Sequence, residues 1–243
     1  SHATGAAKRR RPRPARSRPS SPLAFPAARA QMVAMAALTR MDIARAVRLE
    51  GARRSDYDLN PEIKREAHAG RVLRPAAVLC GVVERPRGLS VILTQRPANL
   101  RDHAGQIAFP GGKKDPEDPD AIATALREAE EEVGLPRSAV DVLGVIDPYE
   151  TGTGFRVDPV VGWVDPAARL VLDPLEVAEA FEAPLDFLLD PANLKRHKGT
   201  WGGRERLYYA IPWQGRYIWG ATAGMLKSLA DRVAALAATD AAE

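Results

Sequence analysis

The sequence predicts an α+β or α/β fold built around a mixed β-sheet. Runs typical of strands alternate with helical patterns in no regular order, and the 243 residues contain no internal repeat. Hydrophobic residues make up 45% of the chain and charged residues 27%, the usual balance of a globular domain with a buried core. No apolar stretch approaches the roughly 20 residues that a membrane-spanning helix needs, which excludes that class of protein.

The first 40 residues differ in composition from the rest. They contain five prolines, nine Lys or Arg residues and no Asp or Glu, so we expect residues 1–40 to form a disordered basic tail. A cloning remnant or an over-extended start (with Met32, Met35 or Met41 as the true beginning) is favoured over an organelle leader or a basic arm for nucleic acid. The other residues, 41–243, carry 26 basic and 31 acidic side chains, a net charge of −5. The folded domain is therefore not expected to bind nucleic acid.

Cys80 is the only cysteine, which excludes a disulfide-stapled secreted scaffold and a zinc site built from cysteines alone. A lone thiol in an apolar run favours a reducing compartment. We expect a cytoplasmic protein, or an organelle-matrix protein if residues 1–40 are a leader.

Residues 41–74 are predicted to be a helical N-terminal extension. Ile43, Ala46 and Val47 have helical spacing, residues 56–60 form a polar break, and Pro61 suits the first turn of a second short helix that ends near His68.

The main domain, residues 75–243, is predicted from its periodicity and its turn residues. A hairpin is expected at residues 85–88, where Pro and Gly separate two β-rich runs. Strands are predicted at 77–83, 89–95, 106–109 (ended by Pro110, Gly111 and Gly112), 140–146, 157–164 and 207–212, with a mixed stretch at 175–189 and a final helix through Met225, Leu226, Leu229, Val233 and Leu236.

A helix over residues 120–135 has clear start and stop signals. Asp118 is predicted to cap it, Pro119 to occupy its first position and Gly134 to end it. The expected buried stripe consists of Ile122, Leu126, Ala129 and Val133.

Glu128, Glu131 and Glu132 are predicted to share a second face of this helix, about 130° from the stripe. Their repulsion is most easily tolerated when a cation lies among them, and hard oxygen ligands favour Mg²⁺ or Mn²⁺. A solvated acidic face is the plain alternative. Gly111 and Gly112 favour the metal, because a tight turn there can present main-chain groups to a phosphate or a cation.

The helix and the residues before it resemble the Nudix box. Gly112, five residues, Asp118 and then REAEEEVGL at 127–135 are similar to its pattern of Gly, five residues, Glu, seven residues and Arg-Glu-apolar-x-Glu-Glu-x-Gly-apolar. The nine-residue signature matches at every fixed position. Upstream, Asp118 replaces the Glu of the pattern, and eight residues instead of seven separate it from Arg127. These two differences leave the role of Asp118 unassigned. The resemblance implies a Nudix fold, a mixed sheet sandwiched between helices, and a diphosphatase.

Residues 93–112 resemble the additional motif of the coenzyme A pyrophosphatase branch of this family, and the similarity extends over about 74–233. That branch cleaves the diphosphate of coenzyme A to 4′-phosphopantetheine and adenosine 3′,5′-bisphosphate.

The resemblance also implies roles. Glu128 and Glu132 would be the principal ligands of Mg²⁺ or Mn²⁺ and Glu131 a third, with Glu128 alternatively the catalytic base. Catalysis would therefore involve Glu128, Glu131 and Arg127, since Arg127 is expected to hold Glu128 through a charge-assisted pair.

Substrate contacts are expected from Arg96, Arg101, His103, Gly111 and Gly112, since the 3′-phosphate of coenzyme A needs basic groups. A further metal-binding carboxylate is sought among Glu176, Glu179 and Glu182, in a stretch expected to be helical, and residues 152–155 resemble a loop beside the site.

The expected partner is thus a small-molecule substrate, with no membrane involved and the oligomeric state open. One alternative is a Nudix hydrolase of another nucleoside diphosphate derivative, such as ADP-ribose or NADH. The other is a non-catalytic Nudix-like binding module, against which the presence of all three glutamates argues.

Overall fold

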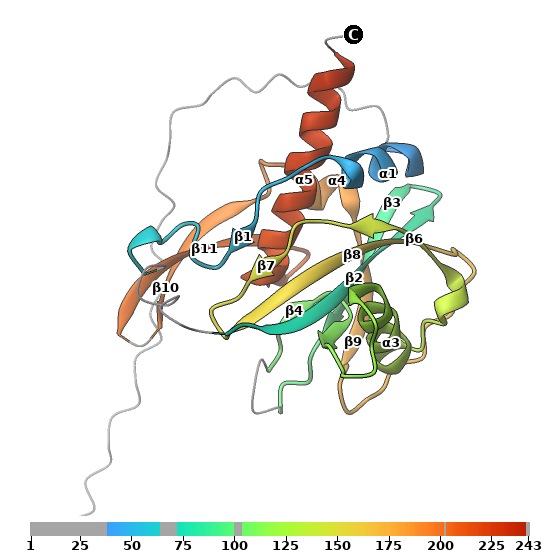
Figure 1. Cartoon of the computed structure of the whole chain (residues 1–243), viewed down its shortest axis with the longest axis horizontal. Coiled ribbons are helices and arrows are strands. Elements are labelled where there is room, and N and C mark those ends of the chain that lie inside the picture. Colours follow the sequence, from blue (N-terminus) through green and yellow to red (C-terminus); the bar gives the residue numbers. More distant parts are fainter. Residues whose placement is uncertain (1–37, 64–71, 100–103, 202, 242–243) are drawn as a thin grey trace, which may run out of the picture. The chain divides into compact units, whose positions relative to one another are not determined.

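A mixed β-sheet forms the centre of the protein. The computed structural model describes residues 38–63, 72–99, 104–201 and 203–241 (Figure 1). Within them, nine strands form one sheet, with the path β1-β7-β8-β2-β3-β4 and with β5, β6 and β9 paired to β2, β8 and β3. The pairs β1–β7 and β2–β8 are parallel and the others antiparallel, so the predicted mixed sheet is confirmed. These strands are β1 (Arg54–Ser55), β2 (Arg74–Arg85), β3 (Gly88–Gln95), β4 (Ile107–Ala108), β5 (Gly111–Lys113), β6 (Val140–Val145), β7 (Tyr149–Glu150), β8 (Phe155–Val164) and β9 (Glu179–Pro184).

Strand β2 contributes side chains to two hydrophobic cores. Its side chains alternate, so that Cys80 and Val82 belong to one core while Leu79 and Val83 belong to the other. The first core is closed by α1, α4 and α5 and the second by α3 (Figure 1). This confirms a sheet sandwiched between helices. The helices are α1 (Arg40–Arg48), α3 (Ala121–Val133), the 3₁₀ turn η1 (Arg137–Ala139), α4 (Leu185–Leu189) and α5 (Ala221–Asp240).

The expected hairpin joins β2 and β3. Arg85 pairs with Gly88 across a two-residue turn, and the φ of Gly88 is +118°, a conformation that residues with a Cβ rarely adopt. The turn of the hairpin therefore lies where the sequence predicted it.

Helix α1 confirms the helical spacing seen after residue 40. It begins with a capping box in which the Thr39 side chain accepts from the Asp42 N–H and the Asp42 carboxylate accepts from the Thr39 N–H. Ile43, Ala46 and Val47 are buried in the same core as α5. The second expected helix begins at Pro61 and is described only through Ile63. The rest of it, and residues 1–37, lie outside the described residues.

Helix α3 begins later than predicted. Asp120, not Asp118, caps it, because the Asp120 carboxylate accepts a 2.8 Å hydrogen bond from the Ala123 N–H. Asp118 and Pro119 lie outside the helix, so that part of the prediction is wrong. The predicted end is confirmed, since Gly134 takes the left-handed conformation with φ of +63°.

The buried face of α3 is rotated from the predicted stripe. Ala129 and Val133 are buried as expected, but Ile122 and Leu126 are only half-buried. Thr124, Ala125 and Glu132 are buried instead. Ala125 is fully buried in the core between α3 and the sheet.

A second sheet was missed by the sequence analysis except for its middle strand. β10 (Lys195–Trp201), β11 (Arg204–Trp213) and β12 (Arg216–Trp219) pair antiparallel in that order. β10 has no apolar alternation to indicate a strand, because its sequence is KRHKGTW. None of the helices in the described residues combines the length and apolar character needed to cross a bilayer.

Candidate active site

Arg127 lies at the centre of the acidic face of α3. Its Nη1 donates to Glu128 Oε1 at 3.0 Å and to Glu131 Oε2 at 2.9 Å, and its Nη2 donates to the main-chain oxygen of Lys113 at 3.1 Å. The predicted pair of Arg127 and Glu128 is confirmed. Glu128 and Glu131 therefore share the guanidinium of Arg127, which lies on the same helix.

Asp118 holds this guanidinium from the other side. Its Oδ2 accepts from Arg127 Nη2 at 2.9 Å, from Thr124 Oγ1 at 2.9 Å and from the Asp115 N–H at 3.0 Å. The Arg127 hydrogen bonds hold the pKa of Asp118 well below its usual range and raise that of Arg127. Thus the unassigned upstream acid orients Arg127.

Glu132 is the most buried acid of the helix, with 4% of its surface exposed. Its Oε2 accepts the Gly111 N–H at 3.1 Å, and its Oε1 lies 3.8 Å from Arg96 Nη1. Burial raises the pKa of Glu132 to about 7, and the charges of Glu128 and Glu176 add to this effect. The three glutamates therefore do not share one environment, since the side chain of Glu131 is 57% exposed.

Neither Gly111, against β2, nor Gly112, against α3, has room for a side chain. A Cβ on Gly112 would lie 2.4 Å from Glu128 Oε2, and one on Gly111 would lie 2.5 Å from the oxygen of Ala77. The expected turn is wrong in form, because these residues form β5 beside β2. The main-chain N–H of Gly111 is nevertheless directed at the site, where it binds Glu132. Glu128 is itself half-buried, and burial raises its pKa.

Of the three later glutamates, Glu176 is the one whose charge acts on the site, since it raises the pKa of both Glu128 and Glu132. Glu182 is paired with Arg85 at 2.6 Å and Glu179 with Arg216. Glu179 and Glu182 lie in β9 rather than in the expected helix.

Asp158 is an acid that the sequence analysis did not select. It lies in β8 opposite Ala77, which belongs to the core under α3, and Ala77 is in turn opposite Gly112. Burial raises the pKa of Asp158 although Arg156 Nη2 lies 3.1 Å away. In the sequence, Asp158 could have been found as a lone acid near the start of an apolar strand.

Two predicted substrate residues, Arg101 and His103, lie outside the described residues. The resembling loop at 152–155 is held by Asp56, whose carboxylate accepts the Gly152 N–H at 2.7 Å and the Tyr149 hydroxyl at 2.9 Å. That anchoring fixes the loop against β7.

The donors at the site suit a hard divalent cation in their chemistry, because Glu128, Glu132 and Glu176 are carboxylates that repel one another at close range. Their arrangement is not a closed cage: in the described part of the chain, no three His, Cys, Asp or Glu side chains are grouped to hold a metal ion. Arg127 binds Glu128 Oε1 and Glu131 Oε2, so a cation held by these two carboxylates would use their other oxygen atoms.

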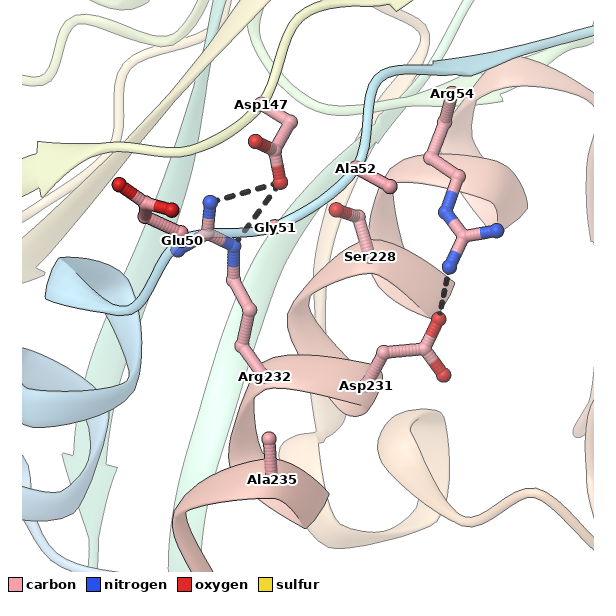
Figure 2. Close-up of a pocket in the computed structure, with 9 residues that line it drawn as sticks. All are labelled: Glu50, Gly51, Ala52, Arg54, Asp147, Ser228, Asp231, Arg232 and Ala235. Atoms are coloured by element: carbon pink, nitrogen blue, oxygen red, sulfur yellow. Dashed lines mark hydrogen bonds and ion pairs between the residues drawn. The ribbon is translucent and has the colours of Figure 1, made fainter.

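A separate pocket, between α5 and the segment 50–54 that follows α1, is structural (Figure 2). Arg232 Nη2 donates to Asp147 at 2.7 Å and its Nη1 to the oxygen of Val47 at 3.0 Å, which caps the end of α1. The cavity is about 80 Å³, well below the roughly 300 Å³ of a small-ligand pocket.

Comparison with known proteins gives consistent matches. Residues 73–201 match the NUDIX domain family, a range that includes all of α3. A protein named uncharacterized Nudix hydrolase NudL from Photorhabdus laumondii is 43% identical over 160 residues, 66% of this chain and 85% of that protein. The NudL of Escherichia coli (strain K12) is 44% identical over 178 residues, 71% of this chain and 88% of that one. Among solved structures, a MutT protein from Methanosarcina mazei Go1 (20% identity, TM-score 0.42, 70% of this chain and 97% of that one) and a C. elegans Ap4A hydrolase (20%, 0.40, 47% and 82%) also match.

Proposed function

The chain belongs to the Nudix hydrolase family, whose members hydrolyse diphosphate bonds, and from this premise we propose that its substrate is coenzyme A or a derivative of it. The products would be 4′-phosphopantetheine and adenosine 3′,5′-bisphosphate. Hydrolysis of another nucleoside diphosphate derivative is the alternative that the experiment below tests.

One observation carries the choice of substrate. The segment 93–112, which resembles the motif of the coenzyme A branch, is also the segment that contacts the carboxylates of α3. Arg96 faces Glu132, the Gly111 N–H binds Glu132, and Gly112 leaves room for Glu128. A substrate-selecting motif is expected to lie against the reacting groups, because discrimination depends on contacts made in the transition state.

We propose that the glutamates of the site are the metal ligands. Glu128 and Glu132 would hold Mg²⁺ or Mn²⁺, with Glu176 contributing from outside the helix and Glu131 from its exposed side. Such a cation supplies neutralisation of phosphate charge and a bound water of lowered pKa. Glu128 would alternatively act as the base that accepts a proton from the attacking water.

The other residues of the site are proposed to orient Glu128 or to bind the substrate. Arg127, itself held by Asp118, keeps the Glu128 carboxylate in a fixed orientation through the 3.0 Å bond. Arg96, whose Nη1 lies 3.8 Å from Glu132 Oε1, carries a charge suited to a phosphate. Arg101 and His103 are proposed to bind the 3′-phosphate, and Gly111 and Gly112 to line the diphosphate.

The test is product analysis with the purified chain. Coenzyme A, dephospho-coenzyme A, ADP-ribose and NADH are incubated separately with Mg²⁺ or Mn²⁺, and the products are separated by chromatography. The proposal predicts release of adenosine 3′,5′-bisphosphate, fastest from coenzyme A and lost in a chelator. Faster turnover of ADP-ribose or NADH would overturn the substrate while leaving the family intact.

A further inference from the structure

The segment 171–178, which leads into β9, runs along α3 at the level of Glu132. The Asp173 N–H donates to the main-chain oxygen of Glu132 at 3.0 Å, and the Ala178 N–H donates to that of Gln95 at 2.9 Å. One end of the segment is therefore hydrogen-bonded to the helix that carries the acids, and the other end to the last residue of β3. The segment thus connects two elements of the candidate active site.

Residues 173–177 of this segment form a turn whose main chain is fixed. The main-chain oxygen of Asp173 accepts from the N–H of Glu176 at 3.1 Å and from that of Val177 at 2.9 Å, and Asp173 Oδ1 accepts the Leu175 N–H at 2.8 Å. Val177 is 2% exposed and belongs to the core under α3. Because hydrogen bonds and burial fix the turn, little backbone freedom is lost when a ligand contacts Leu175.

Leu175 is 78% exposed, and among the large hydrophobic side chains that the structure describes only that of Val72 is more exposed. Single exposed leucines are common, so the exposure by itself does not indicate a site. The position of Leu175 does, because its neighbour in the chain is Glu176, whose Cα is about 3.8 Å away across a trans peptide bond. The charge of Glu176 raises the pKa of both Glu128 and Glu132. Leu175 therefore adjoins the carboxylates at which the diphosphate would be cleaved.

Leu175 differs in chemistry from the other residues at the site. Arg96 brings a cation and Gly111 a main-chain N–H, both facing Glu132, and Gly112 has no side chain. Among the residues that we assign to the site and that the structure describes, none other offers an exposed aliphatic side chain. Since an aliphatic side chain gives a ligand apolar contact alone, Leu175 suits an apolar group close to the diphosphate.

We propose that Leu175 is a specificity-determining residue, which contacts the two methyl groups of the pantoyl part of coenzyme A. This inference rests on the proposed function. In coenzyme A these methyl groups are separated from the diphosphate by one oxygen, one methylene and the carbon that bears them, whereas the adenine ring lies beyond a ribose. ADP-ribose and NADH have a ribose on both sides of the diphosphate. Contact with Leu175 would therefore favour coenzyme A, because it buries apolar surface in that complex and not in the others.

The proposed contact is made to one half of the substrate, the half that leaves as 4′-phosphopantetheine. Binding of that product should therefore depend on Leu175, while binding of adenosine 3′,5′-bisphosphate should not. Leu175 has no group that could move a proton or hold a cation, so its loss should raise KM with little effect on kcat. Because the side chain is 78% exposed, its replacement should also leave the melting temperature nearly unchanged.

The test is steady-state kinetics of the full chain with coenzyme A, dephospho-coenzyme A and ADP-ribose, together with inhibition by the two products. Leu175→Ser is expected to raise KM about 5-fold for both coenzyme A compounds, and not for ADP-ribose, since it removes a one-sided apolar contact. Inhibition by 4′-phosphopantetheine should weaken by a similar factor. Leu175→Met, which keeps the apolar volume, should restore most of the affinity. Val171→Ser is the matched control, because Val171 is 71% exposed on the same segment but lies beside Gly134.

Unchanged KM values in Leu175→Ser, or the same rise in Val171→Ser, would overturn the proposal. An equal rise for ADP-ribose, or equally weakened inhibition by adenosine 3′,5′-bisphosphate, would do so as well, because either would show a general displacement of the turn. Self-association that Leu175→Ser abolishes would assign the side chain to contact with a second copy. The unaltered chain separates the two hypotheses: faster turnover of ADP-ribose would overturn the proposed function and this inference together, whereas preferred turnover of coenzyme A that is indifferent to Leu175→Ser would overturn this inference alone.

Discussion

Arg127 Nη2 lies 2.9 Å from Asp118 Oδ2, although nine positions separate the two residues and a turn of chain lies between them. The same guanidinium binds Glu128, so the carboxylate upstream of α3 is connected to the reacting face through one side chain. The chain has one residue more than the usual box spacing and a side chain one methylene shorter than Glu. Because Asp118 lies in a turn before the helix cap, the additional residue is accommodated there and the contact with Arg127 is kept.

Asp118→Ala is expected to lower both stability and turnover. Removing one partner of a buried ion pair costs about 3 kcal/mol or more, and urea unfolding of the metal-free protein measures it. Turnover should fall because Glu128 loses its orientation. The control is Asp115→Asn, whose carboxylate is 62% exposed and 3.8 Å from Arg127; an equal loss there would contradict the argument.

Glu132→Gln is expected to reduce kcat by about 100-fold or more while the protein stays folded, because an amide is a poor metal ligand. Glu130→Gln is the matched control on the same helix, since Glu130 is paired with Arg137 on the solvent side. Calorimetric titration with Mn²⁺ separates binding from chemistry. Unchanged Mn²⁺ affinity in Glu132→Gln would argue against its role as a ligand.

Gly112→Ala is expected to displace Glu128, since its Cβ would come 2.4 Å from the carboxylate. We expect weaker Mn²⁺ binding and a lower melting temperature. In Gly152→Ala the nearest atom would be at 3.5 Å, an ordinary contact, so that variant should melt close to the unaltered chain. Equal melting temperatures for all three proteins would show that β5 can move aside.

Asp56 is expected to make an unusual contribution to the pH dependence of the free energy of unfolding. Burial raises its pKa above the usual value, so the folded state holds this proton at pH values where the unfolded chain, near pKa 3.9, has lost it. Its contribution to the free energy of unfolding therefore increases as pH falls from the folded pKa toward about 4. In Asp56→Asn this increase should be smaller, as measured by urea unfolding at about pH 7.5 and about pH 5 in chelator. The same pH profile in both proteins would contradict it.

Arg232→Leu is expected to cost about 4 kcal/mol, because it leaves Asp147 without its ion pair and uncaps α1. Lys227→Ala, which removes an i,i+4 pair with Asp231 on the same helix, should cost about 0.5 kcal/mol. Denaturant unfolding gives both values, and a loss in Arg232→Leu no larger than that in Lys227→Ala would show that the pocket is not structural.

The sequence predicted those parts of the fold that depend on local signals. The hairpin at Pro86, the end of α3 at Gly134 and the pairing of Arg127 with Glu128 all involve neighbours in the chain or one helical face. What it could not predict depends on distant contacts. The burial of Glu132 results from β5 packing on β2, and β10 is a strand because β11 pairs with it, not because of its own residues.

The parallel pairing of β2 with β8 has a consequence for the order of folding. Ten pairs, from Arg74 with Phe155 to Val83 with Val164, join residues 81 positions apart. Closing so long a loop is entropically unfavourable, and such non-local pairing slows folding. The whole of α3 and β5 lies within that loop, and α3 packs on a core that contains residues of both β2 and β8, so the sheet that supports the acids of α3 is complete only once the loop has closed. Refolding should therefore regain diphosphatase activity in the same slow phase as sheet formation, with no earlier intermediate that is active.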